Sequence, residues 1–295
     1  ELRRRAIRAL EGSLVVDDSF FDRQHFGEDW GPLSRSWFNA PHGAVSVNNN
    51  TVGVRGRPIA IDGDPSRYAG TFFVEMMRRE GIEVTGTVRT GVTVPESAQL
   101  LASSDSKPLA EIASDLNKIS NNFIAEQILK TLGAEIGGPP GTAEKGLAVV
   151  ASYLKKLGIP SSGFALFDGS GLSHSNRLSA RTMVKVLTAS LRDFEFGPEF
   201  LASLKVAGID GKVKRFDDPI CKRRMRVKTG HLYGVASLAG YGETVCGRRV
   251  VFAVLANDYR RGRRAADRGI EDVCEVFLSS GAVEGPLVAS DLLHK

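Results

Sequence analysis

The C-terminal part of the chain contains the pattern that most restricts how it can fold. Three strand-like runs follow one another with short turns between them, beginning at Lys228 and continuing over 235–241 and 249–257. Apolar residues at helical spacing then mark a closing amphipathic helix, namely Ile270, Val273, Cys274 and Phe277. Helices followed by an antiparallel meander and a closing helix predict an α+β domain, in which helices flank an antiparallel sheet.

The region before these strands has the periodicity of helices. Apolar residues at helical spacing predict three helices, over 109–119, 147–157 and 179–191. Ser120, Asn121 and Asn122 interrupt this pattern after the first helix, and a further helix begins directly behind them. Either asparagine is a natural N-cap, because its side chain can accept a hydrogen bond from a backbone N–H of the first turn.

The first hundred residues have a different pattern. A helix is predicted from Pro65 to Gly81, and the run 82–88 alternates as a strand does. Residues 93–107 form a polar connector. The sequence therefore predicts one region over 1–100, which includes this helix and strand, a second over 101–282, and a tail over 283–295.

Composition and charge exclude several classes of protein. The 295 residues carry a net charge of +5, which mildly favours anionic partners. The basic runs are short and have no aromatic residues between them, so we expect solvated surface charge and no nucleic-acid partner. A polyanionic partner such as a cell-wall polymer stays compatible with this charge. The apolar run over 250–256 is too short to span a bilayer, so no transmembrane segment is expected.

The cysteines and histidines do not have the spacing of metal ligands. Cys221, Cys246 and Cys274 are far apart, and the five histidines include no pair at ligand spacing. We therefore expect no metal and no cofactor. Nothing at the N-terminus has the pattern of a signal peptide. The sequence also begins without an initiator Met, so we expect that an upstream segment exists.

Lys228, Thr229 and Gly230 form the triplet with the clearest chemistry. On a strand edge, the lysine supplies a cation for a carboxylate and the threonine supplies a hydroxyl donor. The glycine lets a substrate backbone lie against the strand. Alone, the triplet is equally compatible with a solvated strand lysine, and Ser120 and Asn122 are equally compatible with simple helix caps. Their order along the chain favours a shared site.

Together these residues resemble the penicillin-binding proteins with D-alanyl-D-alanine carboxypeptidase/endopeptidase activity, in the low-molecular-mass class C group. The segment 117–126, which contains Ser120 and Asn122, resembles the Ser-x-Asn motif of that family, and 168–173 resembles its Asp-Gly-Ser-Gly-Leu-Ser loop. The segment 207–211 precedes the Lys-Thr-Gly triplet, and 238–241 follows it, in the same order as in the family. Residues 13–60 resemble the family's inserted domain more loosely.

The resemblance implies a fold, a mechanism and a location. The fold would be part of a β-lactamase/transpeptidase-like domain over 101–282, preceded over 1–100 by part of an inserted accessory domain. A serine would attack the D-Ala-D-Ala amide of a peptidoglycan stem peptide and form an acyl-enzyme, with no cofactor. The protein would be periplasmic or otherwise extracytoplasmic. β-Lactams would inhibit it if the segment that carries the nucleophile is present.

The resemblance also assigns roles to residues of this chain. Ser120 would relay a proton to the leaving amine, and the Asn122 side chain would hold the peptide amide. Lys228 and Thr229 would bind the terminal carboxylate beside Gly230. The backbone N–H of His231 would be half of the oxyanion hole.

Asp17 and Phe21 would line the pocket for the side chain of the substrate's third residue. For Asp17, capping of its own turn at the end of a strand is an equally good interpretation.

The family's Ser-x-x-Lys nucleophile motif is expected before Ser120 and the inserted domain. Two such strings exist, 104–107 and 152–155. The first lies in the polar connector and the second comes after Ser120, so neither is interpreted as the nucleophile. We therefore expect the nucleophile to lie outside these 295 residues.

Two histidines replace residues that are common in the family. His174 stands where an arginine usually binds a substrate carboxylate, and a histidine binds an anion only when protonated. His231 stands where a small hydroxyl residue is common. The sequence therefore leaves three hypotheses, which are a serine peptidase that lacks its nucleophile segment, a non-catalytic relative that binds cell-wall peptides, and a basic protein that binds polyanions.

Overall fold

The computed structural model describes residues 2–30, 36–259 and 262–280, which form two compact units. The first unit contains the chain up to Ile112 together with Asn121–Arg177. The second contains Ala113–Ser120 and the chain from Leu178 onward. The boundary expected near residue 100 stays a prediction, and the expected tail over 283–295 lies outside the described residues.

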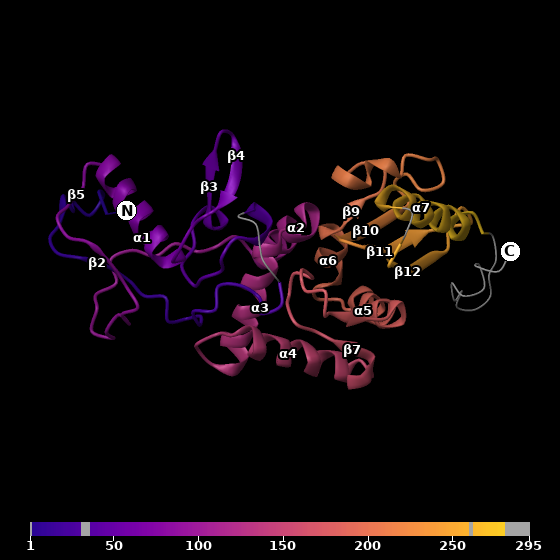
Figure 1. Ribbon diagram of the computed structural model, residues 1–295, viewed down its shortest axis with the longest axis horizontal. Coiled ribbons are helices and arrows are strands. Elements are labelled where there is room, and N and C mark those ends of the chain that lie inside the picture. The colour runs from indigo at the N-terminus through magenta and orange to yellow at the C-terminus, as the bar shows by residue number, and fades with distance from the viewer. Residues whose placement is uncertain (1, 31–35, 260–261, 281–295) are drawn as a thin grey trace. The chain divides into compact units, whose positions relative to one another are not determined.

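The second unit is built on a four-stranded antiparallel sheet with the order β12-β11-β10-β9 (Figure 1). The strands are β9 (Lys205–Val206), β10 (Met225–Leu232), β11 (Val235–Glu243) and β12 (Arg249–Asn257). The helices of this unit are α5 (Ala180–Arg192), α6 (Gly197–Ser203) and α7 (Arg263–Ser279), with the 3-10 helix η4 (Gly211–Arg215). The predicted α+β meander and closing helix are therefore confirmed.

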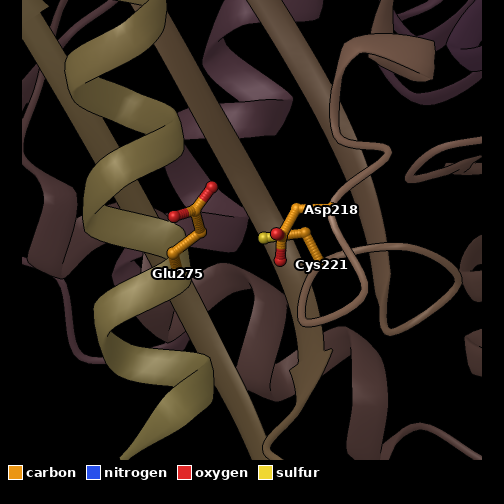
Figure 2. Close-up of side chains that lie close together, drawn as sticks. All are labelled: Asp218, Cys221 and Glu275. Carbon is orange, nitrogen blue, oxygen red and sulfur yellow. The ribbon is translucent and has the colours of Figure 1, made fainter.

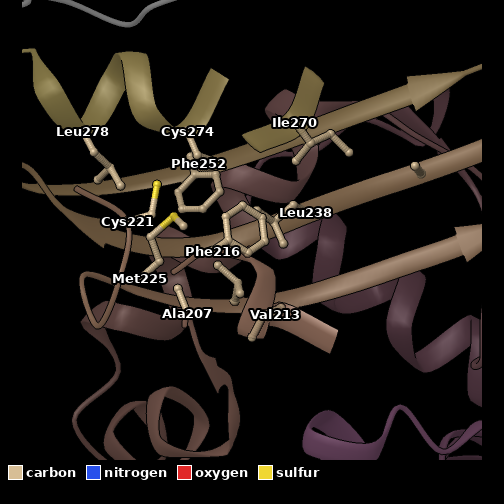
Figure 3. Close-up of a cluster of buried hydrophobic side chains, with 12 residues drawn as sticks. Ala207, Val213, Phe216, Cys221, Met225, Leu238, Phe252, Ile270, Cys274 and Leu278 are labelled. Carbon is tan, nitrogen blue, oxygen red and sulfur yellow. The ribbon is translucent and has the colours of Figure 1, made fainter. Parts of the chain in front are cut away.

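The two faces of this sheet are buried by different helices. On one face, α7 covers a cluster of buried side chains that includes Cys221 and Cys274 (Figure 3). On the other face, Leu187 of α5 and Leu204 pack against Tyr241 of β11. Burying an aliphatic or aromatic side chain contributes about 1.5–3 kcal/mol. These two clusters therefore hold the sheet between its helices.

Part of β10 is an open sheet edge. β9 pairs only with Arg226 and Val227, so no described strand covers the outer side of the strand from Lys228 to Leu232. On the inner side, β11 pairs with every residue of β10. Gly240 of β11 is needed for this pairing, because a Cβ there would lie 2.0 Å from the Arg226 carbonyl oxygen.

The first unit contains short strand pairs and three full helices. The strands are β1 (Ala9–Leu10), β2 (Leu14–Val16), β3 (Thr51–Val54), β4 (Arg57–Ala60), β5 (Glu83–Val84), β6 (Val88–Thr90) and β7 (Phe164–Ala165), which pairs with β8 (Arg177–Leu178). The helices are α1 (Pro65–Arg79), α3 (Asn122–Gly137) and α4 (Ala143–Lys156), with the 3-10 helices η1 (Trp37–Asn39), η2 (Asn48–Asn50) and η3 (Ser161–Gly163). α2 (Leu109–Ile119) begins in this unit and continues into the other.

One element of the first unit differs from its prediction. The single strand expected over 82–88 is two short strands, β5 and β6, which pair with β1 and β2 respectively. Gly86 lies at the break, where a Cβ would come within 1.9 Å of the Gly12 carbonyl oxygen. The close passage of another backbone therefore divides the run. None of the described helices is sufficiently long and apolar to cross a bilayer.

Candidate functional site

Three consecutive residues at the junction of α2 and α3 have different structural roles. Ser120 directly follows α2 in the left-handed conformation, with φ of 63°, and its N–H donates to the Leu116 carbonyl. Asn121 caps α3, because its side chain accepts from the Ile124 N–H at 3.2 Å. The capping role falls to Asn121 and leaves the Ser120 and Asn122 side chains to other contacts. A left-handed serine is uncommon and is often found at functional sites.

Lys228 connects the open edge of the sheet to this junction. Its Nζ donates to Ser120 Oγ at 2.7 Å and to the Thr229 carbonyl oxygen at 2.8 Å. Burial, together with smaller contributions from the nearby charges of Lys205 and Lys212, lowers the pKa of the Lys228 ammonium to about 8. The structure thus brings together two of the residues predicted from the sequence, 108 positions apart.

The backbone of β10 presents hydrogen-bonding groups at the open edge. The Met225 carbonyl accepts from the Ala207 N–H on the β9 side of the strand. Backbone groups alternate sides along an antiparallel strand, so those of Thr229 and His231 also face this side. β9 ends before it reaches them. The N–H of His231 is therefore directed toward the open edge, as the oxyanion hypothesis requires.

Gly230 faces β11 on the inner side of β10. A Cβ at this position would lie 2.4 Å from the Ser237 hydroxyl. The glycine therefore allows the cross-strand serine to approach.

The open edge lies in a positively charged environment. Lys205 is only 3% exposed, and burial followed by the charge of Lys212 lowers the pKa of its ammonium. The Asp210 carboxylate opposes this shift, and it is already paired with Lys118 at 2.6 Å. Positive charge at the edge thus exceeds negative charge, which favours an anionic ligand.

His231 is anchored on the face of the sheet covered by α7. Its Nε2 lies 2.9 Å from Asp267 Oδ1, and Asp267 also pairs with Arg215 at 2.8 Å. Arg215 in turn lies 2.7 Å from the Glu271 carboxylate. Burial lowers the pKa of the His231 imidazole, and the Asp267 carboxylate opposes that shift. The side chain of His231 therefore ties the open edge to α7.

In the first unit, Asn122 and Phe38 make a direct contact. The Asn122 side-chain amide donates to the Phe38 carbonyl at 2.9 Å. Phe38 and the neighbouring Trp37 belong to η1 and are both partly exposed aromatic residues. The Asn122 amide is thus held by a backbone carbonyl within its own unit.

Asp17 and Phe21 lie beside a hollow of about 220 Å³ in the first unit. The hollow is lined by Asp18, Ser19, Phe21, Arg23, Gly91, Val92 and Thr93. Asp17 does not line it; its side chain accepts from the Ser19 and Val94 N–H groups. Hydrogen bonds with Ser19 and with the Val94 N–H lower the pKa of Asp17. Phe21 therefore lines the hollow and Asp17 does not, and the role of both toward a substrate stays a prediction. Asp18 and Arg23, which the sequence did not single out, lie 3.5 Å apart in the hollow.

The Asp-Gly-Ser-Gly-Leu-Ser loop is a tightly bonded turn. Asp168 accepts from the Trp30 indole N–H at 2.9 Å and from the backbone of the loop itself. The buried Glu126 carboxylate accepts from the N–H groups of Gly169 and Ser170. Burial raises the pKa of Glu126. His174 follows the loop as an exposed residue whose carbonyl accepts from Arg177.

The two Ser-x-x-Lys strings lie in different surroundings. Residues 104–107 belong to an exposed segment without regular structure. Ser152 and Lys155 are exposed on α4. Neither setting holds a serine beside a lysine in a buried site.

One group of side chains has ligand atoms close enough to hold a metal ion. It consists of Asp218, Cys221 and Glu275, which converge in the second unit (Figure 2). Sequence spacing could not reveal this group, because Glu275 lies on α7 and the other two residues precede β10.

The fold defines the class of protein. Penicillin binding protein 4 (dacB) from Haemophilus influenzae matches with a TM-score of 0.81 over 94% of this chain and 77% of that chain, at 25% sequence identity. The structure of that protein in complex with a β-lactam matches with a TM-score of 0.71. The chain therefore has a penicillin-binding-protein fold, as the resemblance implied.

The family follows from the sequence comparison. A model of the D-Ala-D-Ala carboxypeptidase 3 (S13) family matches residues 58–279, and the chain belongs to this family. The D-alanyl-D-alanine carboxypeptidase DacB of Haemophilus influenzae is 26% identical over 89% of this chain and 68% of its own length.

Two further relatives have similar names. The D-alanyl-D-alanine carboxypeptidase of Actinomadura sp. is 28% identical over 82% of this chain and 59% of its own length. The carboxypeptidase DacB of Mycolicibacterium smegmatis is 30% identical over 90% and 58%. The chain thus spans 58–68% of the length of these relatives.

Proposed function

We propose that this chain is the substrate-gripping part of a serine-type D-Ala-D-Ala carboxypeptidase/endopeptidase that acts on peptidoglycan stem peptides. The observation that carries the proposal is the hydrogen bond of 2.7 Å between Lys228 Nζ and Ser120 Oγ at an open strand edge. The family and the names of the relatives support the reaction class. The activity would be extracytoplasmic, where the substrate polymer lies.

Lys228 would act in two ways. Its ammonium would attract the terminal carboxylate of the peptide, with Thr229 as the adjacent donor. Through its hydrogen bond it would also hold the Ser120 hydroxyl in one orientation. A lysine with a pKa of about 8 can pass a proton at neutral pH more readily than an ordinary lysine. Ser120 would then carry that proton to the leaving amine.

The backbone at the open edge would bind the rest of the peptide. An extended peptide can lie along the unpaired side of β10 and bond to its backbone as an added strand does. The N–H of His231 would stabilise the developing oxyanion, and the Asn122 amide would hold the peptide bond. In the first unit, the hollow lined by Asp18, Phe21 and Arg23 would by itself accept a polar side chain.

The acyl-enzyme would form on a serine outside this chain. Fluorescent penicillin tests this proposal, because β-lactams acylate the nucleophile of such enzymes. We expect covalent labelling of the full gene product and no labelling of the 295-residue chain. Ser120→Ala in the full product should slow the labelling, whereas Ser152→Ala, on the exposed face of α4, should not change it. Labelling of the 295-residue chain would refute the external nucleophile.

A second candidate is a non-catalytic relative that binds cell-wall peptides. The replacement of two common family residues by His174 and His231 favours it. This candidate predicts a full gene product that folds and binds D-Ala-D-Ala peptides but is not labelled by penicillin.

A further inference from the structure

Asp218, Cys221 and Glu275 come together from segments that are far apart in the sequence. Asp218 and Cys221 lie in the turns between η4 and β10, and Glu275 lies on α7. One ligand atom from each side chain lies within 4.8 Å of the other two. Zinc binds sulfur at about 2.3 Å and carboxylate oxygen at about 2.0–2.2 Å. Small side-chain adjustments would therefore bring all three atoms onto one ion.

Cys221 is a buried thiol directed into this group. Its side chain is 1% exposed, and within the described ranges its sulfur has no hydrogen-bond partner. Figure 2 shows the three side chains directed toward one another, with the sulfur beside the Asp218 carboxylate. The three residues thus combine one buried thiol, which can bind a metal, with two partly exposed carboxylates.

The two carboxylates of the group lie outside the ion pairs found in the described part of the chain. Among the residues that the structure describes, neither Asp218 nor Glu275 forms an ion pair with lysine or arginine. On the same helix, by contrast, Asp267 and Glu271 are both paired with Arg215. Two unpaired carboxylates this close repel each other, and a divalent cation between them removes the repulsion.

We propose that Asp218, Cys221 and Glu275 form a zinc site that fastens the turn before β10 to α7. On binding, the Cys221 thiol releases its proton to solvent and its sulfur bonds to the ion. One oxygen from each carboxylate and a water molecule complete a four-coordinate site. Zinc is favoured over magnesium and calcium because a thiolate is a soft ligand. The site is separate from the open edge of β10 and does not depend on the proposed peptidase activity.

Metal titration of the purified 295-residue chain tests the proposal, with Zn²⁺ by calorimetry and Co²⁺ by absorbance. We expect one ion per chain and a sulfur-to-cobalt charge-transfer band. Cys221→Ser should remove the band, and Glu275→Gln should weaken binding at least about tenfold. Asp218→Asn should do the same, while its side-chain oxygen can still accept from the Ile220 N–H. Cys246→Ser is the matched control, because that thiol is exposed and outside the group.

Two outcomes would overturn the proposal. One is a wild-type chain that takes up no more zinc than Cys221→Ser, which would mean that the thiol is only a small core side chain. The other is zinc uptake that is lost in Cys246→Ser but unchanged in Glu275→Gln. Because Glu275 is only partly buried, its variant should fold even if the substitution of Cys221 disrupts the core.

Discussion

At the scale of single residues, the Lys228 ammonium connects the parts of the candidate site. It lies on an open strand edge, is itself half-buried, and is held between the Ser120 hydroxyl and the Thr229 carbonyl. Burial makes the charged form costly, so a partner anion would gain more from this lysine than from a solvated one. The Lys205 and Lys212 charges act in the same direction.

The first prediction concerns pH. Carboxylate binding at the open edge should weaken as the pH rises through about 8, because Lys228 then loses its charge. NMR titration with acetyl-D-Ala-D-Ala on either side of this pH measures the affinity. Lys228→Arg keeps its charge throughout and should remove the dependence. An affinity that is constant across this range in the wild type would contradict the carboxylate role of Lys228.

The lowered pKa of Lys228 also makes the free energy of unfolding depend on pH. The folded pKa of about 8 lies below the ordinary value of 10.5. Between these two values the unfolded chain binds more protons than the folded one. The contribution of Lys228 to the free energy of unfolding therefore rises as the pH increases across this interval.

The second prediction concerns the repulsion between the charges of Lys205 and Lys228. Lys205→Met should raise the pKa of Lys228, because it removes a nearby like charge. NMR titration of the Lys228 side-chain signal follows this change. Lys214→Met, an exposed residue of η4, is the control and should leave that pKa unchanged. Equal pKa values in the wild type and Lys205→Met would show that the Lys205 charge does not contribute to the shift.

At the scale of elements, several segments are positioned by single residues. Asn121 separates two helices, and Gly240 allows β10 and β11 to pair closely. Glu126 fixes the 168–173 loop from within α3 by accepting from two backbone N–H groups. Such local bonds position the loops more strictly than hydrophobic burial alone.

The third prediction concerns this loop. Glu126→Ala should lower the free energy of unfolding by about 2 kcal/mol or more, because two backbone N–H groups lose their acceptor. Glu126→Gln keeps an acceptor oxygen and should cost distinctly less. Urea denaturation of both variants gives the comparison. Equal losses would mean that the carboxylate charge, and not the hydrogen-bond acceptor, fixes the loop.

Elements with clear periodicity could be predicted from the sequence, and those set by contacts could not. The helix before Ser120 and the three long strands follow directly from apolar spacing. The two residues of β9, by contrast, form a strand only because they pair with β10. The run 82–88 is divided by another backbone that passes beside Gly86, which no local pattern encodes.

The candidate site shows the same limit. Motif order indicated Ser120 and Lys228 as partners, because each occurs in a motif of recognisable spacing. Nothing in the sequence separates Asp17 from Asp18, since only the turn geometry decides which side chain reaches the hollow. The group around Cys221 joins residues more than fifty positions apart and is visible only in three dimensions.

At the scale of the whole molecule, the net charge of +5 is distributed in short runs over two compact units. Such a surface attracts anions weakly and without base recognition. Positive charge near Lys228 is instead concentrated at the candidate site. This distribution of charge fits the small carboxylate-bearing peptide that is proposed as the substrate.

The fourth prediction follows from this distribution of charge. The chain should show no tight, salt-sensitive binding to duplex DNA at physiological ionic strength. Fluorescence anisotropy at low and physiological salt measures this. Binding that is still tight at physiological salt, and whose affinity falls steeply as more salt is added, would favour the polyanion-binding hypothesis.

The most direct measurement compares two ligands that differ only at the terminus. Acetyl-D-Ala-D-Ala and its C-terminal amide can be titrated into the chain and followed by NMR at the backbone signals of Thr229 and His231. The proposed carboxylate grip predicts that the acid binds at least about tenfold more tightly than the amide. It also predicts that Lys228→Met removes this preference. Equal affinities for the two ligands, or a preference that survives in Lys228→Met, would contradict it.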